Sequence, residues 1–137
     1  MSFEAARKNI MAHFSSNFSG VAADKIAWDN VAFKPVTGSP WVRVSIQGNL
    51  NNFASIGGPS IKVRRLGIVF VQVFVPEGTG TLVADQLADD IADALEAKQL
   101  LTGETFQAST KTEAGANNGW YQLNVSTPFY FDEQRTL

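Results

Sequence analysis

His13 is the only histidine of the chain and the first residue whose type could perform chemistry. It stands beside Met11 and Phe14. The sequence holds no second histidine and no cysteine that could complete a familiar transition-metal site. A histidine can also activate a nucleophile, but no recognisable nucleophile motif surrounds this one. We interpret His13 as a boundary or surface residue and expect no enzyme activity, metal or cofactor.

Carboxylates crowd the segment from residue 82 to 97. Asp85, Asp89 and Asp93 follow one another there at four-residue spacing, which places them one above another on a helix. Such a row could hold a hard cation or face an arginine-rich partner. Its simplest interpretation is a solvated helix face, and a contact with another subunit is the functional alternative.

The segment Pro76–Gly80 follows an apolar run and precedes a helix pattern, which invites comparison with phosphate-binding loops. It lacks the Gly-Lys-Ser or Gly-Lys-Thr ending of those loops. Glu77 at its mouth would also repel a phosphate. We therefore predict a turn in which Gly78 and Gly80 serve the backbone conformation.

The only basic cluster contains Lys62, Arg64 and Arg65, with Arg43 expected on the neighbouring strand. It could be an ordinary charged strand end, an interface with acidic residues of another subunit, or a contact with DNA phosphate. Eleven basic residues against thirteen acidic ones give a net charge of -2. This balance favours a protein partner over DNA.

Two helices and several strands must position these side chains. Apolar residues recur every three or four positions over residues 2–18 and again over 82–97, which predicts two amphipathic helices. Residues 41–47 alternate between apolar and polar types, as a strand with one wet face does. The polar, glycine-rich segment 48–62 predicts a long, flexible and functional loop.

The remaining segments are extended. Residues 63–75 form a strand that is apolar on both faces, so we expect both faces to be covered. Residues 26–35 predict an extended segment anchored by aromatic side chains. Strands are expected over 105–112 and 120–131, joined by the turn chemistry of 115–119.

These elements predict one α+β domain over residues 1–137, in the order helix, strand, strand, helix, strand, strand. Its sheet is expected to be mixed and mostly antiparallel, with four or more strands packed against two helices. A chain of 137 residues, 45% hydrophobic, suffices for one core. The N-terminus lacks a signal-peptide pattern and no apolar run would span a membrane, so we expect a cytosolic protein.

Several of these segments together resemble the tail terminator proteins of long-tailed phages. The resemblance rests on the first helix, on residues 26–35, on Trp41-Val42-Arg43-Val44, and most of all on residues 67–80 running into 84–91. None of these is a catalytic signature. The resemblance covers nearly the whole chain.

The resemblance implies a virion structural protein that forms a hexameric ring on the tail tube in the host bacterial cytoplasm. Such a ring would stop tube polymerisation and face the head-tail connector, while genomic DNA passes through its lumen without specific binding. No membrane is involved. The 48–60 loop would reach the tube or a neighbouring subunit. The expected oligomer or tube interface contains Arg43, Asn51, Asn52, Phe53, Lys62, Arg64, Arg65, Asp85, Asp89 and Asp93.

Three alternatives remain open at this point. Head-tail joining proteins and tail tube proteins share the general fold that the resemblance implies. A small-ligand or peptide module would use Trp28, Trp41 and Trp120 to line a groove. A DNA-contacting module would use the basic cluster.

Overall fold

The computed structural model describes residues 2–136, and its side chains are described except at residues 49, 50 and 52–57. The chain forms an α+β domain, as expected. Its elements are α1 (Phe3–Asn17), η1 (Ala23–Lys25), β1 (Ile26–Trp28), β2 (Trp41–Gly57), β3 (Ser60–Pro76), α2 (Leu82–Leu95), β4 (Thr105–Phe106), β5 (Thr110–Asn117) and β6 (Trp120–Thr136).

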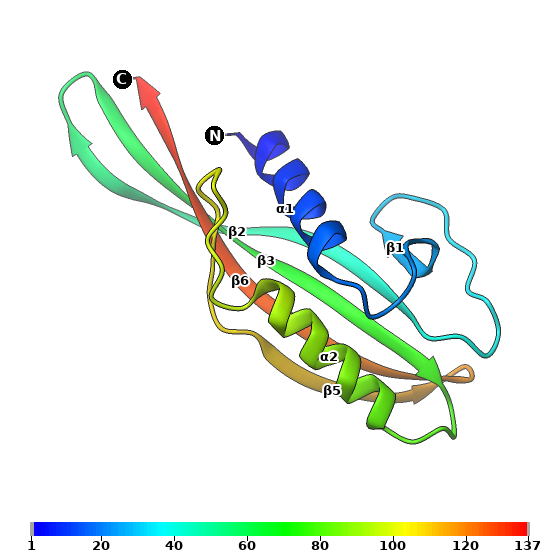
Figure 1. Cartoon of the computed structure of the whole chain (residues 1–137). Helices are drawn as coiled ribbons and strands as arrows, with labels where there is room; N and C mark the ends of the chain where they lie inside the picture. Colours follow the sequence, from blue (N-terminus) through cyan, green and yellow to red (C-terminus); the bar gives the residue numbers. More distant parts are fainter. Residues whose placement is uncertain (1, 137) are drawn as a thin grey trace.

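One sheet joins all these strands in the order β1-β2-β3-β6-β4, and β5 also pairs with β6. Every pairing is antiparallel except that of β1 with β2. Both helices lie on the same face of this sheet (Figure 1). The prediction of a mostly antiparallel sheet packed with two helices is therefore confirmed, but the predicted order of elements is incomplete.

The expected long loop at 48–62 is wrong. Strands β2 and β3 run through this segment and turn only at Gly58 and Pro59, where Gly58 has a φ of 61°. The ends of β2 and β3 then pair with each other, with register shifts after Gly48 and after Phe53, and β3 pairs with the end of β6. We call this three-stranded projection, residues 49–65 and 131–136, the arm. It extends beyond the helices in Figure 1.

Two further differences concern strand boundaries. The segment 26–35 contributes the short strand β1, and the expected strand 105–112 is divided into β4 and β5. Strand β4 pairs with residues 129–130 of β6, whereas β5 pairs with residues 120–126. Pro128 lies between these stretches and has no N–H to donate, so a continuous ladder is impossible there.

The predicted β5–β6 turn is confirmed at Asn118 and Gly119, whose φ angles of 54° and 83° are those of a tight hairpin. The predicted turn role of Gly78 and Gly80 is also supported, since their φ angles are 86° and 82°. Thr81 occupies the N-cap position of α2, but its side chain makes no capping hydrogen bond.

A single core lies between the helices and the sheet. Residues of the predicted stripes fill it from α1 and α2, although Phe3 and Val83 are exposed rather than buried. Gly67 of β3 allows the closest approach in this layer, because the Phe129 ring lies directly over it. The sheet contributes alternate residues, which include Val42, Val44, Val69, Val71, Val73, Val75, Leu123 and Val125.

Candidate functional site

The sheet face opposite the helices, which we call the open face, is the main surface that the fold leaves available. Large apolar side chains of β3 point to it, and Leu66, Ile68, Phe70 and Phe74 are each only partly buried. No helix of the described residues crosses this face (Figure 1). The prediction that β3 would be covered on both faces is therefore wrong within the monomer.

One end of the open face carries an aromatic cluster. Trp41 stacks on Phe74 with ring centroids 4.1 Å apart, and Phe33 lies 5.0 Å from Trp41. Trp120 meets Trp41 edge-on, and the Arg43 guanidinium lies 5.6 Å from the Trp41 ring. These contacts leave Trp41 only 6% exposed. The cluster closes this end of the open face.

Trp28 does not join that cluster. It packs edge-on against Phe14 of α1, on the helical face of the sheet. The three tryptophans therefore lie on opposite faces, and the predicted groove lined by Trp28, Trp41 and Trp120 does not exist.

The arm carries ion pairs that the sequence did not reveal. Arg64 donates to both carboxylate oxygens of Asp132, at 2.9 and 3.1 Å, and lies 4.3 Å above the Tyr130 ring. These hydrogen bonds lower the pKa of Asp132. Arg65 donates to Glu133 at 3.2 Å. Both arginines of the basic cluster thus have partners within their own chain, and Arg64 and Arg65 already brace β3 against β6.

The antiparallel register explains these pairs. Arg64 lies directly opposite Asp132, while Arg65 lies diagonal to Glu133. The available signal was two adjacent basic residues near the end of one expected strand and two adjacent acidic residues near the end of another. Pairing them required the strand register. Lys62 is exposed and forms no ion pair within the described residues. Asn51 is also exposed in the arm, whereas the side chains of Asn52 and Phe53 lie outside the described residues.

The acidic row of α2 is a solvated face with one intramolecular partner. Lys111 of β5 donates to Asp85 at 3.0 Å, and this hydrogen bond raises the pKa of Lys111. Asp89 and Asp93 are exposed and form no ion pair within residues 2–136. The structure does not bring this row near the basic cluster in the same chain, since Lys111 and Arg64 lie on different strands far apart along β6.

His13 of α1 contacts the end of α2. Its Nε2 lies 2.8 Å from the carbonyl oxygen of Ala94 at the end of α2, and its ring stacks on Phe106. The side-chain amide of Asn17 lies 3.2 Å from Nδ1. If Nε2 carries the proton, it donates to Ala94 while Nδ1 accepts from Asn17.

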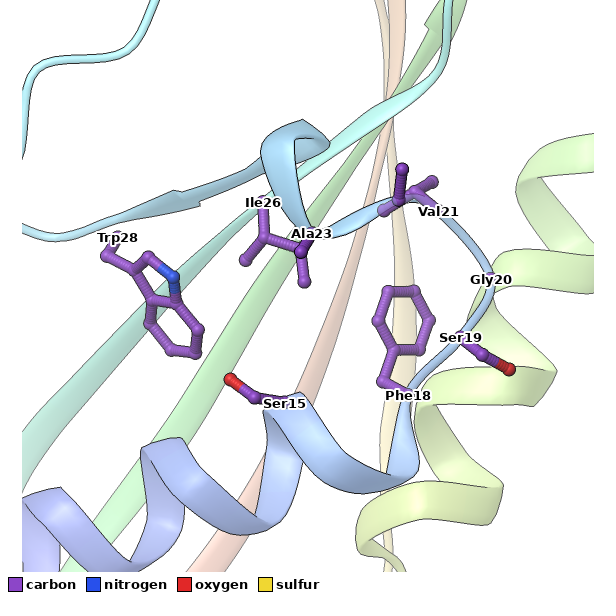
Figure 2. A pocket seen from close by; sticks show the side chains of 9 residues that line it. Ser15, Phe18, Ser19, Gly20, Val21, Ala23, Ile26 and Trp28 are labelled. Carbon is purple, nitrogen blue, oxygen red and sulfur yellow. The ribbon is translucent and has the colours of Figure 1, made fainter.

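A hollow of about 500 Å³ lies beside β1, at the end of α1. Figure 2 shows Trp28 and Phe18 on opposite sides of it, with Ile26 and Ala23 between them and Ser15 on the helix. Phe18 and Ile26 are buried, so the floor is apolar, while the rim is small and exposed. The sequence offered no signal for this hollow, because segments from a helix, a turn and a strand build it.

The described part of the chain holds neither a cluster of metal ligands nor a helix suited to the membrane interior. Residues 2–136 contain no group of three or more histidine, cysteine, aspartate or glutamate side chains arranged to hold a metal ion. No helix among them is both long and apolar enough to cross a membrane.

Comparisons with known proteins identify a family and a similar fold. No curated protein matches it. Thirteen chains of solved structures are similar. One aligns with a TM-score of 0.59 and 16% identity over 93% of this chain and 95% of the other, which shows a likeness of fold alone. A family model described as phage tail terminator protein matches residues 9–129. This chain therefore belongs to the phage tail terminator family and has a structural role in the phage tail.

Proposed function

We propose that this protein assembles into a hexameric ring on the end of the tail tube, stops tube polymerisation and forms the surface that meets the head-tail connector. The observation that carries the proposal is the open face of a tail terminator family member. A sheet with partly exposed leucine, isoleucine and phenylalanine side chains on one face offers a surface for association. A ring needs such interfaces and no reactive group.

The open face supports association because Leu66, Ile68 and Phe70 follow one another in a single apolar row along β3. Phe70 lies in the middle strand, with Ser45 and Ser126 beside it on β2 and β6, and Ile68 lies next to Pro128. Covering each apolar Å² stabilises an interface by about 25 cal/mol before the costs of association. Small polar neighbours around large apolar residues also match the apolar core and polar rim of protein interfaces.

The arm supports the proposal as a reaching element. It is three strands wide, and the partly buried Arg65–Glu133 pair and the bidentate Arg64–Asp132 pair hold β3 to β6. These pairs hold the base of the arm together, and the arm projects far enough from the helices to contact a neighbouring subunit or the tube. We propose that Asn51, Asn52, Phe53 and Lys62 make that contact, with Arg43 contributing from the open face and Asp85, Asp89 and Asp93 from α2.

A tail assembly assay tests this function. Tails made in the host cytoplasm without the protein should contain tubes of uncontrolled length, and adding the wild-type protein should restore one length in electron micrographs. Phe70→Glu should fold normally, because Phe70 is only partly buried, but should not restore the length. Phe3→Glu is the matched control, since Phe3 is 60% exposed away from the open face.

Other outcomes separate the alternatives. Tubes of normal length without the protein would refute termination, and missing heads on such tails would indicate a head-tail joining protein. Incorporation along the whole tube would indicate a tube protein.

We propose that genomic DNA passes through the lumen without specific binding, since the chain is acidic overall at -2. Salt-sensitive DNA binding that Lys62→Glu abolishes would contradict this part.

A further inference from the structure

A rigid hairpin tip between α2 and β4 presents a fully exposed leucine. Leu101 is 107% exposed relative to a free residue. The tip is closed by hydrogen bonds from the Leu100 N–H to the Glu104 carbonyl at 2.8 Å and from the Gly103 N–H to the Leu100 carbonyl at 2.9 Å. Further down, the Phe106 N–H donates to the Lys98 carbonyl at 2.8 Å. The leucine is therefore held out on an ordered support.

A buried carboxylate reinforces this tip. Glu104 is fully buried, and its Oε1 accepts a hydrogen bond of 2.6 Å from the Thr102 hydroxyl. Its Oε2 is buried without a partner in the described part of the chain. A buried polar side chain is stabilised by hydrogen bonds, and the Thr102 hydroxyl supplies one here. Leu100 packs against the core while Leu101, its neighbour, points to solvent.

The hollow beside β1 and the Leu101 tip lie at opposite edges of the sheet. The tip leads into β4, which ends the strand order on one side, and the hollow lies against β1, which ends it on the other. A ring of identical subunits uses heterologous contacts, in which one patch of a subunit meets a different patch of the next. Two different patches at opposite edges of one sheet can form such a contact without competing for the same neighbour.

We propose that Leu101 of each subunit inserts into the hollow of the next copy, against Phe18, Ile26 and Trp28. This inference rests on the proposed ring. Insertion removes the exposed Leu101 side chain from water against an apolar floor, and the small rim residues leave the entrance open. Charge agrees with this pairing, because Lys98 near the tip and Asp24 near the hollow are both exposed and form no ion pair within residues 2–136.

The register of the strands places the two edges of the sheet at different levels. Phe106 of β4 lies level with Gly48 of β2, whereas Ala27 of β1 lies level with Arg43. These levels are five residues apart on β2, or about 17 Å along the strand. A contact between the β4 edge of one copy and the β1 edge of the next therefore joins two different levels of the sheet.

Cysteine cross-linking tests the contact cleanly, because the chain has no native cysteine. Leu101→Cys and Ala22→Cys change exposed side chains and should leave the fold intact. The two single variants are mixed on tail tubes and oxidised with copper-phenanthroline. A disulfide-linked dimer containing one copy of each variant is expected, with little self-linking of either. The double variant should give a ladder of linked subunits. Ala12→Cys, also exposed but on α1, is the mismatched control.

The outcomes distinguish this contact from the ring itself. Rings that form on tubes without a 101–22 cross-link would overturn the knob and hollow while leaving the proposed function standing. A cross-link from position 22 to the tube protein would make the tube the occupant and also overturn the inference. As a second measurement, Leu101→Ser should reduce ring formation at least tenfold, whereas Leu82→Ser, at another exposed leucine, should not. Rescue of Lys98→Glu by Asp24→Lys would support the pairing.

Discussion

Gly67 is the position where a single added methyl group should disturb the fold most clearly. A Cβ at this residue would lie 2.6 Å from Cζ of Phe129 and 2.7 Å from the carbonyl oxygen of Gln47. The phenylalanine ring could rotate or shift, but the carbonyl belongs to the β2–β3 ladder. Gly67→Ala therefore forces the sheet and the ring apart at the base of the arm.

The expected cost follows from these contacts. Overpacking a core by one or two carbons typically destabilises a protein by about 1–3 kcal/mol, and contact with fixed backbone places Gly67→Ala in the upper part of that range. Gly48 supplies a matched control, because it pairs with Gly67 in the ladder and a Cβ added there would meet nothing within 4 Å. Gly48→Ala should be neutral or stabilise by up to about 1 kcal/mol.

Urea unfolding of the purified monomer, followed by circular dichroism, measures both variants. The urea midpoint of Gly67→Ala should fall. In thermal unfolding, its Tm should fall by on the order of 10 °C for a chain of this size. Phe129→Leu should relieve part of the clash, giving a coupling free energy of at least about 1 kcal/mol in a double-mutant cycle. Equal stabilities for Gly67→Ala and Gly48→Ala, or strict additivity with Phe129→Leu, would show that no such clash exists.

Three further predictions concern stability. Arg64 holds the pKa of Asp132 below its unfolded value, so this pair stabilises above about pH 4 and loses its effect as the pH falls further. Asp132→Asn should remove that part of the dependence of the unfolding free energy on pH. The change should be under about 1 kcal/mol because Arg64 is 40% exposed, and an unchanged profile of unfolding free energy against pH would contradict it. His13→Ala removes the contact with Ala94 and should cost about 0.5–1.5 kcal/mol in urea unfolding. Gly119→Ala, at a φ of 83°, should cost about 1–2 kcal/mol, whereas Asn118→Gly should be tolerated in the same assay.

Local patterns predicted the elements wherever one face is apolar. The buried residues Ile10 and Phe14 of α1 and Leu87 and Ile91 of α2 recur at helical spacing, because one side of each helix must face the core. The β5–β6 hairpin was predictable from Asn118-Gly119 for a local reason too, since the turn itself requires positive φ angles.

Local patterns failed where pairing partners are distant in the sequence. Residues 48–62 are polar and rich in glycine and asparagine, so no alternating pattern marks them as strands. They are extended because the start of β3 pairs with the end of β6. The backbone N–H and carbonyl groups of the two strands hydrogen-bond to each other. The separation of β4 from β5 also has a distant cause. Pro128 lies on β6 and has no N–H to donate to the segment between β4 and β5.

The α+β class, the two amphipathic helices, the turns and the family resemblance could all be inferred from the amino-acid sequence, since they depend on neighbours along the chain. The surfaces on which the proposed assembly depends could not. Whether β3 is covered on its second face, whether Arg64 meets Asp132, and whether Leu101 and the hollow lie on opposite edges all depend on strand order and register. Those are set by contacts between residues far apart in the chain, which no local pattern records.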